Sequence, residues 1–280
     1  MADRLLIRAP AKLNLSLRVG ARAADGYHPI ASLMVALAGL EDEVAIARAP
    51  QRRLICPGGP GGAANLAWRA LDALEAHVDR ALPAEVAITK HIPMQAGLGG
   101  GSSDAAAVLV GIDALFGLGL PRPKLEAIGA TLGSDVPFFI RAGTQWATGR
   151  GEHVTPQPIP RDLWGVVCGP AARLSTADVY RSFDALTFPG DLDPSPPRGD
   201  WAGAAWVVND LWPAARALAP GLDAIADELR RHGAVIVLLC GSGGAIAGLW
   251  KDRDAAAAAA GQIDSALAVV RPSPPREGAV

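Results

Sequence analysis

The fold is decided by one glycine-rich stretch, Pro93-Met94-Gln95-Ala96-Gly97-Leu98-Gly99-Gly100-Gly101-Ser102-Ser103. It lies between an alternating run, Glu85–Ile92, that predicts a strand and an amphipathic run, Ser102–Phe116, that predicts a helix. Four glycines in five positions leave backbone N–H groups open to a bulky anion. The first turn of the helix adds unpaired donors and the positive end of the helix dipole. The stretch therefore predicts a phosphate-binding loop.

Two better-known nucleotide loops do not fit this sequence. No Gly-Lys-Ser or Gly-Lys-Thr occurs, which excludes a Walker loop. Ser102 stands where a dinucleotide fingerprint beginning at Gly97 needs its third glycine. The stretch Gly59–Ala64 matches that fingerprint formally, but it has a proline in the turn and only a weak strand before it. A flexible loop with Ser103 as a helix cap is the remaining alternative.

The elements on either side of this loop predict an α+β protein with two domains. The first half contains strand-like runs at Arg4–Ala9, Leu13–Val19, Ile30–Leu37, Glu43–Ala47 and, weakly, Leu54–Cys56, and helical runs at 65–81 and 122–132. The second half contains strand-like runs at Trp164–Cys168, Val235–Leu239, Ala245–Trp250 and Ala266–Val270, and helical runs near 175–186, 206–218, 221–232 and 253–263. Prolines at 156, 158 and 160 mark the boundary, so we expect domains at 1–157 and 158–271 and a disordered tail at 272–280.

Composition limits the class of protein. Half of the 280 residues are hydrophobic and the net charge is −2, which argues against disorder and gives no support for a nucleic-acid partner. No apolar run is long enough to predict a membrane span or an export signal. The three cysteines, Cys56, Cys168 and Cys240, are far apart and form no CxxC pair, so a reducing cytoplasm is expected.

Three further motifs carry polar groups that chemistry could use. Lys12 and Asn14 fall on one face of a strand, although an exposed polar face is the ordinary reading of such a pair. Asp135 stands among apolar residues in Gly133–Phe139, where a helix cap or a turn residue is the alternative. The stretch Gly241–Gly244 lies between two predicted strands and is otherwise a simple hairpin turn.

Together the motifs resemble the GHMP family of small-molecule kinases. The resemblance rests on four motifs: Pro-x-Lys-x-Asn from Pro10, Gly-Leu-Gly-Gly-Gly-Ser-Ser from Gly97, Gly-Ser-Asp-Val-Pro from Gly133, and the late Gly-Ser-Gly from Gly241. The stretches Asp25–His28 and Asn209–Leu211 further resemble those members that act on a cytidine diphosphate-linked methylerythritol. Gln95 and Gly244 depart from the family pattern, which has a small residue and a proline or alanine there. The resemblance spans residues 8 to 250 and implies a two-domain fold with a ribosomal-protein-like N-terminal domain and a ferredoxin-like C-terminal domain.

The resemblance also assigns roles residue by residue. Lys12 and Asp135 would flank the acceptor hydroxyl as the catalytic pair. The residues 93–103, with Asn65 and Lys90, would bind ATP, which acts as its magnesium complex; no protein ligand for Mg²⁺ is assigned. The acceptor would be the 2-hydroxyl of the cytidine diphosphate-linked substrate, and the residues around that substrate would be Asn14, Tyr27, His28 and Tyr180.

Three competing functions remain open at this stage. A kinase of the same family could act on homoserine, mevalonate or a sugar, although Tyr27, His28 and Tyr180 argue against it. A binding module should lack Lys12 or Asp135, and an RNA-binding protein should be more basic. We expect a monomer or weak dimer that binds no nucleic acid and no membrane.

Overall fold

The computed structural model describes residues 4–158, 160, 162–186, 192–196 and 207–276. Its first half contains β1 (Arg4–Val19), β2 (Ile30–Arg48), β3 (Arg53–Ile55), the short helix η1 (Gly62–Ala64), α1 (Leu66–Val78), β4 (Ala84–Thr89), α2 (Gly100–Phe116), α3 (Arg122–Leu132), α4 (Val136–Arg141), β5 (Thr144–Gly149) and β6 (His153–Pro156). Its second half contains β7 (Trp164–Cys168), α5 (Thr176–Asp184), α6 (Trp212–Leu218), α7 (Gly221–Arg231), β8 (Ile236–Leu239), β9 (Ile246–Trp250), α8 (Arg253–Ala260) and β10 (Ala266–Pro272). The α+β class is confirmed.

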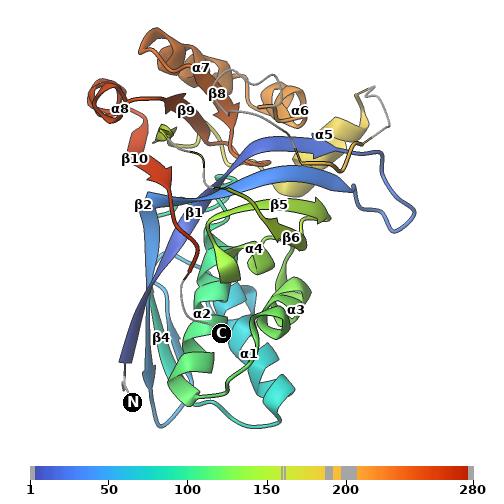
Figure 1. Cartoon of the computed structure of the whole chain (residues 1–280), viewed down its shortest axis with the longest axis vertical. Helices are drawn as coiled ribbons and strands as arrows, with labels where there is room; N and C mark the ends of the chain where they lie inside the picture. The colour runs from blue at the N-terminus through green and yellow to red at the C-terminus, as the bar shows by residue number, and fades with distance from the viewer. Residues whose placement is uncertain (1–3, 159, 161, 187–191, 197–206, 277–280) are drawn as a thin grey trace.

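Two long antiparallel strands, β1 and β2, form the frame of the molecule (Figure 1). The sequence predicts four short strands here, and this prediction is wrong because the breaks between them are irregularities within continuous strands. The register shifts between Pro10 and Ala11 and again between Asn14 and Ser16. A proline, which has no N–H to donate, is tolerated beside such an irregularity.

The helices α1 to α4 pack on one side of this frame (Figure 1). Asn65 caps α1 as predicted, because its side chain accepts a hydrogen bond from the backbone N–H of Ala67. The glycine loop leads into α2, which begins at Gly100, two residues earlier than predicted. The helix α2 is buried along most of its length and packs against α1, α4 and β1. The helix α4 and the hairpin β5–β6 were not predicted.

The second half has the strand order β10-β7-β9-β8, with all pairs antiparallel. Because β8 and β9 are consecutive and β7 lies between β9 and β10, this is the order of a ferredoxin-like sheet. The helices α7 and α8 contact this sheet and lie with α6 on the outer side of the molecule (Figure 1). In the part of the chain that the structure describes, no helix is long and apolar enough to cross a membrane.

Strand β10 joins the two halves. Its residues 266–270 pair with β7, and Arg271 and Pro272 continue onto Ala38 and Leu37 of β2. The prediction of a disordered tail from 272 is wrong as far as Arg276, because Ser273 and Arg276 donate backbone hydrogen bonds to the first half. Residues 277–280 of that predicted tail lie outside the described residues. The boundary between 157 and 158 stays a prediction.

Candidate active site

Two adjoining cavities lie where the halves meet. The smaller, about 380 Å³, is lined by residues 92–102 of the glycine loop together with Asn65, Lys90 and Asp104. The larger, about 740 Å³, is lined by residues that include Asn14, Tyr27, His28 and Tyr180. Five residues line both cavities: Lys12, Ser102, Asp135, Thr176 and Ser242. Of the predicted nucleotide residues, all but Ser103 line the smaller cavity, whereas the predicted substrate residues line the larger one, and Ser102 and the predicted catalytic pair line both.

The glycine loop is locked against the turn Gly241–Gly244 from the second half. Gly97 has a φ of 81°, in the left-handed region, and a Cβ there would lie 1.7 Å from the carbonyl oxygen of Cys240. The turn approaches equally closely, since a Cβ at Gly243 would lie 2.0 Å from Gly97 N. The turn is therefore more than a hairpin connection, because both backbones need glycine to meet.

Lys12 is held in place by buried polar groups. Its side chain is 6% exposed, and its ammonium donates a 2.6 Å hydrogen bond to Asn14 Oδ1. Asn14 in turn donates to Ser32 Oγ at 2.8 Å, and Ser32 donates to the carbonyl of Ser16 at 2.6 Å. Since Lys12 and Asn14 are both buried, the alternative of an exposed polar face is excluded.

Asp135 faces Lys12 with a partly free carboxylate. Its Oδ2 lies 3.8 Å from Lys12 Nζ, and its side chain is 33% exposed. The residue precedes α4 but makes no capping hydrogen bond, so the cap reading is wrong and the carboxylate is available to another group. Burial raises the pKa of Tyr180 to about 12, with a further contribution from the negative charge of Asp135.

Lys90 is held by two carboxylates that the sequence analysis did not identify. Its ammonium contacts Asp42 Oδ2 and donates a 2.7 Å hydrogen bond to Asp104 Oδ2. Asp42 is fully buried, and its Oδ1 accepts from the backbone N–H groups of His91 and Ile92 at 2.6 and 2.8 Å. Burial lowers the pKa of Lys90, but the two carboxylates outweigh this effect and raise it.

The same cluster perturbs Asp104. Burial raises the pKa of Asp104 to about 7, and the charge of Asp42 adds to the rise against the opposing charge of Lys90. Its second oxygen, Oδ1, is buried without a hydrogen-bond partner among the described residues. Asp104 directly follows Ser103, so its place beside the glycine motif was the available signal.

The side chains of two predicted nucleotide residues are not free to bind a nucleotide in the cavity. Asn65 lines the smaller cavity, but its amide oxygen caps α1 and its amide nitrogen donates to the carbonyl of Pro60 at 2.9 Å. Ser103 is fully buried, does not line the cavity, and has no hydrogen-bond partner for its hydroxyl among the described residues. It also does not cap α2, because Gly99 is the cap residue.

The larger cavity brings the two tyrosines of the chain together with His28. Tyr27 is 56% exposed, and the guanidinium of Arg150 lies 4.0 Å from the centre of its ring. Arg150 is fixed by a 2.6 Å ion pair with Asp25. On the other side, the Tyr180 ring lies 5.3 Å from the His28 ring. Arg150 and Asp25 had no predicted role.

His28 is itself buried and anchored. Its Nδ1 lies 2.9 Å from the carbonyl oxygen of Gly20, and its Nε2 lies 2.9 Å from Asp184 Oδ1. Both ring nitrogens therefore lie against protein oxygens, although the direction from Nε2 to Asp184 is not that of a hydrogen bond.

No group of three or more His, Cys, Asp or Glu side chains in the described residues is arranged to hold a metal ion. A magnesium ion usually reaches a kinase site with the phosphates and few protein ligands. The smaller cavity fits that mode, since Ser102 and Asp135 line it with oxygen donors.

Comparison with known proteins places the chain in a family. The model of the GHMP kinases N terminal domain matches residues 65–143, and that of the GHMP kinases C terminal matches residues 198–269. Proteins named 4-diphosphocytidyl-2-C-methyl-D-erythritol kinase from Geobacter sulfurreducens and Streptomyces coelicolor are each 39% identical to the chain. Each match covers 92% of this chain, and 94% and 91% of the respective relatives.

A solved structure shows the same similarity in three dimensions. The crystal structure of 4-(cytidine 5'-diphospho)-2C-methyl-D-erythritol kinase has a TM-score of 0.80 at 33% identity. The match covers 96% of this chain and 100% of that one. The chain therefore belongs to the GHMP kinase family, in the group of its 4-diphosphocytidyl-2-C-methyl-D-erythritol kinases.

Proposed function

We propose that the chain transfers the γ-phosphate of ATP to the 2-hydroxyl of 4-diphosphocytidyl-2-C-methyl-D-erythritol, a step of the non-mevalonate route to isoprenoid precursors. The observation that carries the proposal is the meeting of two cavities at Lys12 and Asp135. A donor phosphate in the smaller cavity and an acceptor hydroxyl in the larger one would face each other at that junction. Such alignment supplies a large part of the rate enhancement in phosphoryl transfer.

Asp135 is proposed to accept the proton of the acceptor hydroxyl as its oxygen attacks the γ-phosphorus. The bond from phosphorus to the bridging oxygen breaks, and ADP leaves. Lys12 lies 3.8 Å from the carboxylate and can stabilise charge on the transferred group. Because Asn14 holds the lysine from the other side, the amine stays pointed at the junction. A base positioned in this way contributes about 10²–10⁴-fold in rate.

The smaller cavity is proposed to hold ATP with its phosphates on the glycine loop. The backbone of residues 93–102 lines it, and the start of α2 offers free N–H groups and a positive dipole. Lys90, which is held by Asp42 and Asp104, also lines this cavity and would contact the nucleotide. Magnesium bound to the ATP would neutralise charge on the phosphates.

The larger cavity is proposed to hold the cytidine diphosphate end of the substrate. Tyr27 and Tyr180 both line it and can offer ring faces to the base. Because both nitrogens of the His28 ring face protein oxygens, its backbone is the better candidate to contact the base edge. Arg22 and Arg181 also line the cavity and are proposed to contact the diphosphate, for which they would exchange their ion pairs with Asp184 and Asp178.

We further propose a cytoplasmic enzyme that works as a monomer or weak dimer without nucleic acid or membrane. Its three free cysteines fit a reducing compartment.

The test is phosphoryl transfer from ATP to the cytidyl substrate, with methylerythritol phosphate, homoserine and mevalonate as control acceptors. Asp135→Asn keeps the shape of the side chain and removes the base, so we expect kcat to fall by about 10²–10⁴-fold while ATP binding is retained. Turnover of homoserine or mevalonate instead would keep the kinase and overturn the substrate. Retained ATP binding without turnover of any acceptor would favour a binding module.

A further inference from the structure

A third cavity lies away from the candidate active site and shares no lining residue with it. Its volume is about 870 Å³, and both halves of the chain contribute to its walls. The first half supplies Arg8, residues 38–41, Glu43 and His91; the second half supplies Trp164, Arg253, residues 267–269 and Arg271. The catalytic pair lines only the other two cavities, so the proposed kinase reaction leaves this one unexplained.

The cavity exists because β10 crosses from one half to the other. The residues Ala38 to Leu40 of β2 have no partner on β1, where the register jumps between Glu41 and Leu37. Gly39 has a φ of 104°, and a Cβ there would lie 2.4 Å from the carbonyl oxygen of Val269. The backbones of β2 and β10 therefore lie in close contact from Gly39 to the paired residues Ala38 and Leu37, and the cavity opens beside this crossing.

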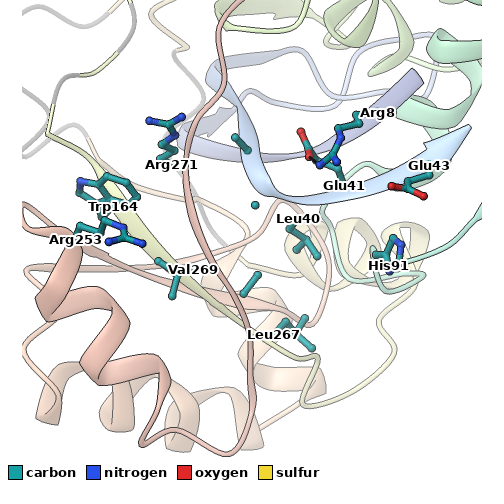
Figure 2. Close-up of a pocket in the computed structure, with 13 residues that line it drawn as sticks. Arg8, Leu40, Glu41, Glu43, His91, Trp164, Arg253, Leu267, Val269 and Arg271 are labelled. Atoms are coloured by element: carbon teal, nitrogen blue, oxygen red, sulfur yellow. Dashed lines mark hydrogen bonds and ion pairs between the residues drawn. The ribbon is translucent and has the colours of Figure 1, made fainter. Parts of the chain in front are cut away.

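The two ends of the cavity differ in polarity, and its centre is apolar. Figure 2 shows Trp164, Arg253 and Arg271 at one end and Glu43 and His91 at the other. Between them lie Leu40, Val269 and Leu267 (Figure 2), and Leu267 is 43% exposed.

The end that contains Trp164 carries more positive than negative charge. The guanidinium carbons of Arg253 and Arg271 lie 5.9 and 6.0 Å from the centre of the indole ring. In the described part of the chain Arg271 has no carboxylate within ion-pair distance, and Arg253 has only the exposed Asp254 at 3.9 Å. At the other end, Arg8 is neutralised by Glu41 at 3.2 Å.

We propose that this crossing cavity binds an organic phosphate with a short apolar group. The phosphate lies between Arg253 and Arg271, because each guanidinium can donate two parallel hydrogen bonds to phosphate oxygens. The apolar group covers Leu40, Leu267 and Val269. The volume is in the range of small-molecule sites, which combine an apolar lining with a few fixed polar groups. Because its walls come from both halves, the ligand stabilises their junction.

The test is titration with octyl phosphate as the probe, followed by isothermal calorimetry and by the melting temperature of the full chain. We expect saturable binding and a rise in melting temperature. Arg253→Met and Arg271→Met should each weaken binding about tenfold, the usual consequence of losing one charge-assisted contact. Arg231→Met is the matched control, because that arginine is exposed on α7 and lies outside the cavity.

Three comparisons distinguish the explanations. Octanol, which has the same chain and no charge, should bind at least tenfold more weakly, and equal binding would overturn the phosphate site. Affinity unchanged in both arginine variants would place the probe elsewhere and also refute the proposal. If a second copy of the chain occupies the cavity instead, sedimentation will show a concentration-dependent dimer that Arg271→Met disrupts. The arginines take no part in the proposed transfer reaction, so the kinase assay reports separately on the proposed function.

Discussion

Asp42 should be among the residues on which the stability of the first half depends most. It is fully buried, accepts two backbone hydrogen bonds through Oδ1, and contacts the ammonium of Lys90 through Oδ2. Asp42→Ala removes both acceptors and leaves a largely buried ammonium with one partner fewer. Each hydrogen bond to a charged group is worth about 1.5–3 kcal/mol, and breaking a buried pair costs about 3–5 kcal/mol. Because these costs overlap, we expect a total loss of about 3–5 kcal/mol.

Urea denaturation followed by circular dichroism measures this loss through the midpoint and slope of the transition. Glu43→Ala is the matched control, because Glu43 is the next carboxylate on the same strand and, within the described residues, its side chain makes no hydrogen bond or ion pair. We expect that control to change stability by no more than about 0.5 kcal/mol. If Asp42→Ala costs no more than Glu43→Ala, the buried charge cluster does not hold this part of the fold together and the reasoning is refuted.

Three further predictions use the same structure. Burial raises the pKa of Asp104 to about 7, so the folded state binds the proton of this carboxyl more tightly than the unfolded state does, and the parent loses stability as pH rises from about 4 to above 7. Asp104→Asn should therefore gain stability relative to the parent between pH 5 and 8. Parallel curves of stability against pH for the two proteins would contradict this. Gly97→Ala should lower the melting temperature sharply or prevent folding, whereas Gly101→Ala, whose Cβ would have nothing nearer than 3.8 Å, should fold normally. Arg150→Met removes the cation over the Tyr27 ring and should raise KM for the cytidyl substrate roughly fivefold at unchanged kcat, and an unchanged KM would show that this ring needs no such support.

The sequence predicts best those elements whose residue pattern lies within one short stretch of the chain. The strand Trp164–Cys168 has the bounds that its apolar run predicts. Asn65 caps α1, as its place before a helical run predicts. The glycine loop is recognisable from the sequence because its residues act through the backbone, so the glycines themselves are the signal, although its contact with Gly241–Gly244 is not visible there. The helix α4 was missed because Pro137 reads as a helix breaker, although proline fits the first turn of a helix, where no N–H is needed.

The buried charge cluster was missed because its members are far apart in the sequence. Asp42 stands between two other acidic residues and resembles part of a solvated face. Its partner Lys90 follows 48 positions later, and only the pairing of β2 with β4 brings the two strands together. One local signal was present. Asp42 is two and four positions before Val44 and Ile46, and alternate residues of a strand share a face, so Asp42 lies on the buried face of β2.

The cavities themselves could not be read from the sequence. Lys12 and Asp135 were predicted from their motifs, but that both line the junction of two cavities depends on how the two halves pack. Thr176 and Ser242 line both cavities, and their hydroxyls lie 2.9 Å apart. Ser242 stands in the Gly-Ser-Gly motif, but nothing in the sequence places that motif beside Thr176 at the junction.

The crossing strand β10 has a consequence for how the chain folds during synthesis. Its partners on β2 precede it by more than two hundred positions, so this pairing is among the most non-local contacts in the molecule. Non-local strand pairing is slow because the chain loses the conformational entropy of the intervening loop before the new contacts stabilise it. While the ribosome is still translating the second half, the edge of β2 at Ala38 and Leu37 stays without its neighbour and exposes hydrogen-bonding groups. The nascent first half is therefore expected to need chaperone protection until residues 271–272 emerge.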